Sequence, residues 1–201
     1  MTLVKSLLAA AALTVFAAPA MAKTPTGDKA PSFSVVDTNG VAHSSDSLKG
    51  KTVILEWTNH QCPYVVKHYS SDNMQNTQKQ LASGDTVWIS VISSAPGKQG
   101  YVSASEANDL TASRGAAPSA VVLDPAGTFG RAYDAKTTPH MYVIDPSGTL
   151  VYQGAIDSNR SSNPATIPGA TNYVKAAMAD LSAGNPVAIG DTQPYGCTIK
   201  Y

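Results

Sequence analysis

The sequence feature that most constrains the fold is a cysteine–proline pair that follows a short apolar segment. Residues 52–57 are apolar and β-branched, and a run of this length is typical of a buried central strand. A loop of four residues separates this strand from Cys62-Pro63. Proline is favoured at the first helical position, where its missing N–H costs no hydrogen bond. The pair therefore predicts a helix from Pro63 to about Leu81, with Cys62 as its N-cap.

The faces of this helix follow from its apolar residues. Val65, Val66 and Tyr69 are expected to face the core, and Lys67 and His68 are expected to face solvent. A thiol at a helix N-terminus lies beside unpaired backbone N–H groups and the positive end of the helix dipole. Both stabilise a thiolate, so we expect Cys62 to ionise more readily than a free cysteine.

The remaining elements alternate along the chain before they end in a hairpin and a helix. Ser103 and Glu106 form the pattern of a capping box at the start of one helix. The expected strands are 34–37, 41–43, 86–92, 120–123, 141–145 and 149–154, and the expected further helices are 103–113, 129–133 and 172–181. This order predicts an α/β fold with a mixed central sheet and helices on both faces.

The N-terminal residues have the pattern of a secretory signal peptide. Lys5 is followed by an apolar stretch at 7–18 and by Ala20-Met21-Ala22, which resembles a cleavage site. We expect residues 1–22 to be removed, and the mature protein to be periplasmic or secreted without a membrane span. Residues 23–183 are then expected to form one domain, and residues 184–201 a mobile tail that carries Cys197.

The composition argues against nucleic acid as a partner. The whole chain has a formal net charge of +0, and only 14% of its residues are charged. The sequence has no basic stripe of the kind that binds nucleic acid. No cofactor is expected.

Several segments resemble the thioredoxin superfamily, and most closely its redoxin, or peroxiredoxin-like, branch. They are the opening residues 27–33, the path from Trp57 through Asn59 to Cys62-Pro63, the Thr138-Pro139 step and the hairpin near residue 145. The resemblance implies a thioredoxin-like fold and a thiol oxidoreductase, with Cys62 in the place of the first cysteine of Cys-x-x-Cys. It also implies a cis proline at Pro139, packed against Cys62. Trp57, Asn59, Pro63 and Thr138 are expected to support this site.

The sequence departs from the family at several points. Val65 occupies the place of the second cysteine, and Asn59 the place of the threonine in the peroxiredoxin motif. The position usual for the peroxidatic arginine is occupied by Pro139-His140, and Arg114 and Arg131 are the other candidates for that role. Peroxide and protein disulfides therefore both stay open as substrates. An unidentified thiol reductant would complete either cycle.

Cys197 is the other cysteine of the chain, and it suggests how an oxidised Cys62 would be resolved. A sulfenic acid or a mixed disulfide on Cys62 can be attacked by a second thiol, and we expect Cys197 to supply it. A permanent structural Cys62–Cys197 disulfide is an alternative. A copper-handling protein is another, because His60 and His140 are expected near Cys62; we expect no metal.

Overall fold

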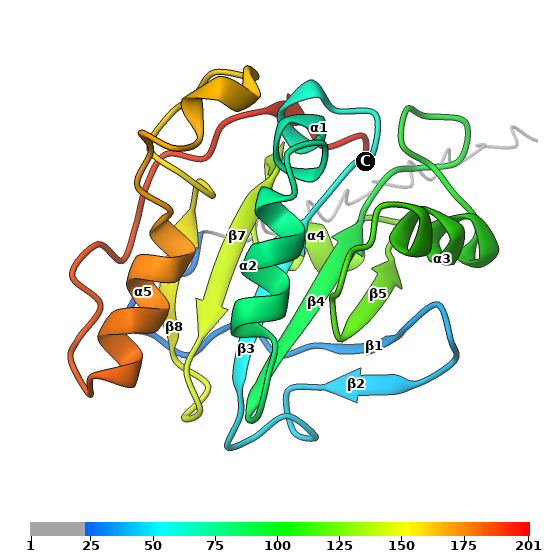
Figure 1. Cartoon of the computed structure of the whole chain (residues 1–201). Coiled ribbons are helices and arrows are strands. Elements are labelled where there is room, and N and C mark those ends of the chain that lie inside the picture. The colour runs from blue at the N-terminus through cyan, green and yellow to red at the C-terminus, as the bar shows by residue number, and fades with distance from the viewer. Residues whose placement is uncertain (1–22) are drawn as a thin grey trace, which may run out of the picture.

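A five-stranded mixed sheet organises residues 23–201, the part of the chain that the computed structural model describes (Figure 1). The strand order is β5-β4-β3-β7-β8. β3, β4 and β5 are parallel, whereas β7 is antiparallel to both β3 and β8. The bounds are Thr52–Trp57 for β3, Thr86–Ile92 for β4, Ala120–Leu123 for β5, His140–Ile144 for β7 and Leu150–Gly154 for β8. The predicted α/β fold and mixed sheet are confirmed, and the expected signal peptide at 1–22 lies outside the described residues.

Each face of the sheet has its own hydrophobic core, because successive strand residues point to opposite sides. Ile54 of β3 lies in the core beneath α1, α2 and α5, which cover the front of the sheet in Figure 1. Leu55 and Trp57 lie in the opposite core with Phe129 of α4. The helices are α1 Pro63–Tyr69, α2 Asn73–Leu81, α3 Ala104–Ser113, α4 Thr128–Ala132 and α5 Tyr173–Ser182.

Short elements complete the fold. β1 (Ser34–Val36) and β2 (Ala42–Ser44) form the predicted antiparallel hairpin. β6 (Thr137–Thr138) pairs with β9 (Cys197–Thr198), and a single 3-10 turn, η1, spans Pro164–Thr166. The Ser103 capping box at the start of α3 is confirmed. Within residues 23–201 every helix is too short or too polar to cross a membrane.

The single helix predicted for residues 63–81 is wrong, because the chain breaks it into α1 and α2. Asp72, before the first residue of α2, has a left-handed backbone with φ of 57°. The Ser71 hydroxyl donates to the carbonyl oxygen of Lys67 at 2.8 Å, so a side chain replaces a helical N–H donor. The turn lets α1 and α2 pack at different angles on one sheet face.

The expected faces of α1 are also corrected. Val66 is 45% exposed, whereas Lys67 and His68 are fully buried. They are covered because the C-terminal segment and the loop after β8 lie over this side of α1. Asp157 in that loop compensates the buried charge of Lys67, with Nζ and Oδ2 3.1 Å apart.

Candidate active site

Cys62 is the N-cap of α1, as the sequence predicts. Its backbone is extended, with φ of −79° and ψ of 123°, and Pro63 begins the helix. The Cys62 carbonyl oxygen accepts from the N–H of Val66 at 2.8 Å, which is the first bond of the helix. Cys62 itself has no exposed surface. The local sequence thus fixes the position of the thiol, and the surroundings remove it from solvent.

The loop before Cys62 is held by Asn59. Its side-chain oxygen accepts from the N–H of Gln61 at 2.9 Å, and its amide donates to the carbonyl oxygen of Gln99 at 3.2 Å. The carbonyl oxygen of Asn59 also accepts from the N–H of Cys62 at 3.0 Å. Asn59 therefore shapes the turn that presents the cysteine.

The step between Thr138 and Pro139 is cis, as the resemblance implies. The Cys62 thiol donates to the carbonyl oxygen of Thr138 at 3.1 Å. In the antiparallel pairing of β6 with β9, Thr138 stands opposite Cys197. Thr138 therefore links the two cysteines, which are 135 residues apart in the sequence.

The two thiols are tuned in opposite directions. Burial raises the pKa of Cys62, but hydrogen bonding from the thiol and backbone of Cys197, the Thr138 side chain and the Val65 backbone outweighs burial and lowers it. Burial and the neighbouring Cys62 raise the pKa of Cys197 to about 11. Cys62 is therefore the better nucleophile of the pair, because the thiolate is the reactive form.

Trp57 does not lie beside the thiol. Its side chain points to the opposite face of the sheet, where it is fully buried and packs on the rings of Phe129, Tyr133 and Tyr142. Its indole N–H donates to the hydroxyl of Ser93 at 3.0 Å. Trp57 is a core residue because successive side chains of β3 point to opposite faces of the sheet, and Trp57 falls on the face away from α1.

His60 and His140, the two histidines expected near Cys62, differ in how exposed they are. His140 is buried, and burial together with Lys23 and Lys136 lowers its pKa to about 3. His60 is partly exposed, and burial and Arg114 lower its pKa. Residues 23–201 contain no group of three or more His, Cys, Asp or Glu side chains arranged to hold a metal ion.

The arginines considered for peroxide chemistry are engaged elsewhere. The guanidinium of Arg114 stacks on the ring of Tyr69, 4.1 Å from its centroid, and that of Arg131 on the ring of Tyr201 at 4.2 Å. The main causes of the pKa shift of Cys62 are burial and its contacts with Cys197, Thr138 and Val65, and neither arginine is among them.

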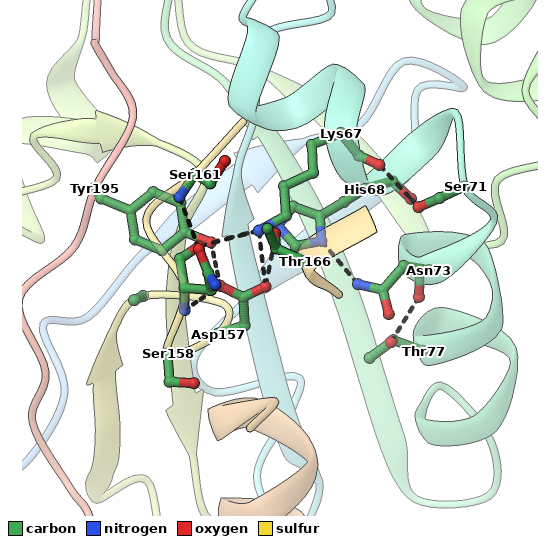
Figure 2. Close-up of polar contacts among 12 residues, drawn as sticks. Lys67, His68, Ser71, Asn73, Thr77, Asp157, Ser158, Ser161, Thr166 and Tyr195 are labelled. Atoms are coloured by element: carbon green, nitrogen blue, oxygen red, sulfur yellow. Dashed lines mark hydrogen bonds and ion pairs between the residues drawn. The ribbon is translucent and has the colours of Figure 1, made fainter. Parts of the chain in front are cut away.

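Sequence reasoning missed a buried polar cluster beside α1, which Figure 2 shows. The carboxylate of Asp157 accepts from Lys67 and from the Tyr195 hydroxyl, and the His68 ring lies next to both. Burial lowers the pKa of His68 to about 4, so its imidazole is neutral near pH 7. The one available signal was Tyr195, two residues before Cys197, because a buried tyrosine needs a partner for its hydroxyl.

A second buried polar group, Glu56 of β3, was also missed. The carboxylate is fully buried and receives the indole N–H of Trp88 at 2.9 Å, the hydroxyl of Ser90 at 3.0 Å and the amide of Gln78 at 3.1 Å. The hydroxyl of Tyr69 donates to its other oxygen at 2.8 Å. This network connects α1 and α2 to the sheet beneath the cysteine.

The chain is similar to known proteins of one family and one fold. The model of the Redoxin family matches residues 25–174. A hypothetical protein from Sinorhizobium meliloti 1021 is 19% identical, with a TM-score of 0.73 over 90% of this chain and 96% of its own. An uncharacterised conserved protein from Geobacillus kaustophilus is 24% identical, with a TM-score of 0.75 over 88% of this chain and 92% of its own.

A more distant structure carries a redox description. It is a candidate thiol:disulfide interchange protein DsbE from Chlorobium tepidum, 23% identical, with a TM-score of 0.51 over 64% of this chain and 84% of its own. At these identities the similarity to solved structures shows a shared thioredoxin-like fold. No curated protein matches the chain.

Proposed function

The chain belongs to the redoxin family, and from this premise we propose that Cys62 and Cys197 are the redox pair of a thiol–disulfide oxidoreductase. The observation that carries the proposal is the pairing of β6 with β9. It sets Cys197 opposite Thr138, whose carbonyl oxygen accepts the hydrogen bond of the Cys62 thiol. The opposite pKa shifts of the two thiols support the roles proposed for them, with Cys62 as nucleophile and Cys197 as resolving thiol.

The reaction proceeds in two exchanges. The Cys62 thiolate attacks one sulfur of a substrate disulfide, forms a mixed disulfide with it and expels the other half as a thiolate. Cys197 then gives up its proton and attacks the sulfur of Cys62, which releases the second half as a thiolate. The substrate gains two electrons, and the protein is left with a Cys62–Cys197 disulfide. A dithiol reductant returns the protein to its starting state by the same exchange.

Disulfide exchange is favoured over peroxide reduction by the surroundings of Cys62. Peroxide cleavage requires positioned donors that stabilise the leaving oxygen. The candidate arginines, Arg114 and Arg131, stack on tyrosines. His140 is neutral near pH 7 and has no acidic proton to give to the leaving oxygen, because burial lowers its pKa to about 3.

The test is to mix fully reduced protein, residues 23–201, with one equivalent of glutathione disulfide and follow intact mass. We expect the wild type to lose two hydrogens and retain no glutathione. Cys197→Ser should retain one glutathione, on Cys62, and Cys62→Ser should react no faster than free glutathione exchanges. Wild-type protein that stays reduced, or Cys197→Ser protein that carries no glutathione, would contradict the proposal.

A parallel sample with hydrogen peroxide separates the other activities. Loss of two hydrogens that is faster with peroxide than with the disulfide would assign a two-cysteine peroxidase instead. A Cys62–Cys197 bond that forms but resists excess dithiothreitol would indicate a structural disulfide.

We also propose that the protein acts in the periplasm or outside the cell, where disulfide chemistry is common. The support is the signal-peptide pattern of residues 1–22. Export predicts a mature N-terminus at Lys23 in the exported fraction.

A further inference from the structure

The C-terminal segment lies across the site instead of hanging free. Ile199 is buried, and its N–H donates to the carbonyl oxygen of Lys136 at 3.0 Å. The β6–β9 register pairs Thr137 with Thr198 and Thr138 with Cys197. In Figure 1 this red segment passes along the top of the sheet beside α1 before it reaches the C-terminus. We call residues 194–199 the strap.

The strap uses the backbone edge that lies next to Cys62. An extended peptide that binds a protein edge does so by adding one strand, and its main chain supplies the hydrogen bonds. Residues 136–138 offer such an edge, and β9 already occupies it. Since Cys62 has no exposed surface with the strap in place, a peptide and the strap compete for the same position.

The strap is fastened by a buried hydrogen-bonded ion pair. The hydroxyl of Tyr195 donates to Oδ1 of Asp157, and Nζ of Lys67 lies 3.1 Å from Oδ2 of the same carboxylate. Lys67 also donates to the carbonyl oxygen of Asn159 at 3.0 Å. The Tyr195 ring packs edge-on against Tyr64 in the first turn of α1, with centroids 5.7 Å apart. Figure 2 shows Tyr195 and Lys67 converging on Asp157 from opposite sides.

We propose that the strap is a gate, fastened by Tyr195 and Asp157, that an extended peptide disulfide must displace before it can pair with residues 136–138 and reach Cys62. The proposal rests on the proposed function, because it concerns the substrates that Cys62 would attack. Tyr195 acts through the strap and is a positioning residue. A small disulfide needs only access to the sulfur, whereas a peptide also needs the backbone edge. The gate therefore discriminates against peptides.

The experiment compares two probes in the Cys197→Ser background, in which Cys62 is the one remaining thiol. The probes are 2-hydroxyethyl disulfide and an eight-residue extended peptide whose central cysteine carries a glutathione disulfide. Adding Tyr195→Phe removes the hydroxyl from Asp157 and keeps the ring. We expect the rate with the peptide to rise roughly tenfold, the size expected for loss of one hydrogen bond to a charged group. The rate with the small disulfide should rise less than about fivefold, which is half of the rise expected with the peptide.

Tyr173→Phe is the matched control, because the Tyr173 hydroxyl forms no hydrogen bond with the described residues. It should leave the ratio of the two rates unchanged. An equal increase with both probes for Tyr195→Phe, or no increase with the peptide, would overturn the gate.

A second measurement needs no change at Tyr195. Opening of the strap sets an upper limit on how fast the peptide probe can reach Cys62, so the peptide should react no faster than the Ile199 amide opens in hydrogen exchange. If the peptide reacts with Cys62 faster than the Ile199 amide opens, the strap is not the gate. If the Ile199 amide is protected but neither probe exchanges with Cys62, the strap still covers the thiol. The proposed function then fails, and the peptide gate fails with it.

Discussion

At Cys62, burial and ionisation oppose each other. A buried thiolate is disfavoured by the loss of solvent, and only donors aimed at the sulfur can restore it. As a thiol, Cys62 donates a hydrogen bond to the carbonyl oxygen of Thr138. As a thiolate, it depends on the Cys197 thiol and the Thr138 side chain, which lower its pKa. In the proposed reaction, Cys197 would act as a donor in the first step and as a nucleophile in the second.

Two substitutions of Cys197 separate these roles. Cys197→Ala removes the donor, so the pKa of Cys62 should rise relative to the wild type. Cys197→Ser keeps a hydroxyl at the same place, so the rise should be smaller. The measurement is the rate of iodoacetamide alkylation at Cys62, read by mass between pH 5 and pH 10. Identical pKa values in the two variants would show that Cys197 donates nothing to the thiolate.

At the level of elements, the sequence predicts what local chemistry decides. The apolar run of β3 and the capping box of α3 lie within a few residues, and both occur as expected. The burial of Lys67 depends on Asp157, which lies 90 residues away in the sequence. The residues of α1 alone therefore could not predict this burial. The position of Cys62 at the N-cap of α1 could be predicted from the sequence. The prediction of a mobile tail at 184–201 is wrong for Cys197–Thr198, which form β9.

β9 itself depends on Gly196. This residue has φ of 127°, a backbone conformation that other residues rarely adopt, and a Cβ there would overlap the carbonyl oxygen of Thr138. Gly196→Ala should therefore lift β9 from β6. We expect the Cys62–Cys197 disulfide to form at least tenfold more slowly under the same oxidant, because each 1.4 kcal/mol of weakened docking is about tenfold in the docked population.

Gly184→Ala is the control for this prediction. Gly184 also has a positive φ, 72°, but open space surrounds the position of its Cβ. The substitution should cost stability without slowing disulfide formation in the folded protein. Equal rates for Gly196→Ala and the wild type would mean that β9 need not dock for the cysteines to meet.

Across the whole molecule, two buried histidines make stability depend on pH. Burial lowers the pKa of His68 to about 4 and that of His140 to about 3, below the value of about 6.5 for an exposed histidine. In the unfolded chain both take up protons as the pH falls through 6.5, whereas the folded protein keeps them neutral. The unfolded state binds more protons, so stability is fully present above pH 6.5 and falls toward pH 4.

The expected loss between pH 7 and pH 4.5 is on the order of 2–5 kcal/mol in the free energy of unfolding. Urea titrations at several pH values measure it. His140→Asn retains an acceptor near the position of Nδ1 but cannot be protonated, so it should lower stability at pH 7 and flatten the pH dependence. A wild type whose stability stays constant over this range would contradict the assignment.

The position of β9 at the far end of the sequence also has a consequence in time. Ribosomes add about 5–20 residues per second, so Cys197 is synthesised roughly 7–27 seconds after Cys62, which precedes it by 135 residues. During that interval the nascent chain carries the Cys62 thiol without the strand that covers it. Any thiol or disulfide nearby reaches Cys62 before its own partner does. The segment that protects Cys62 from the reactions of other chains is therefore made well after Cys62 itself.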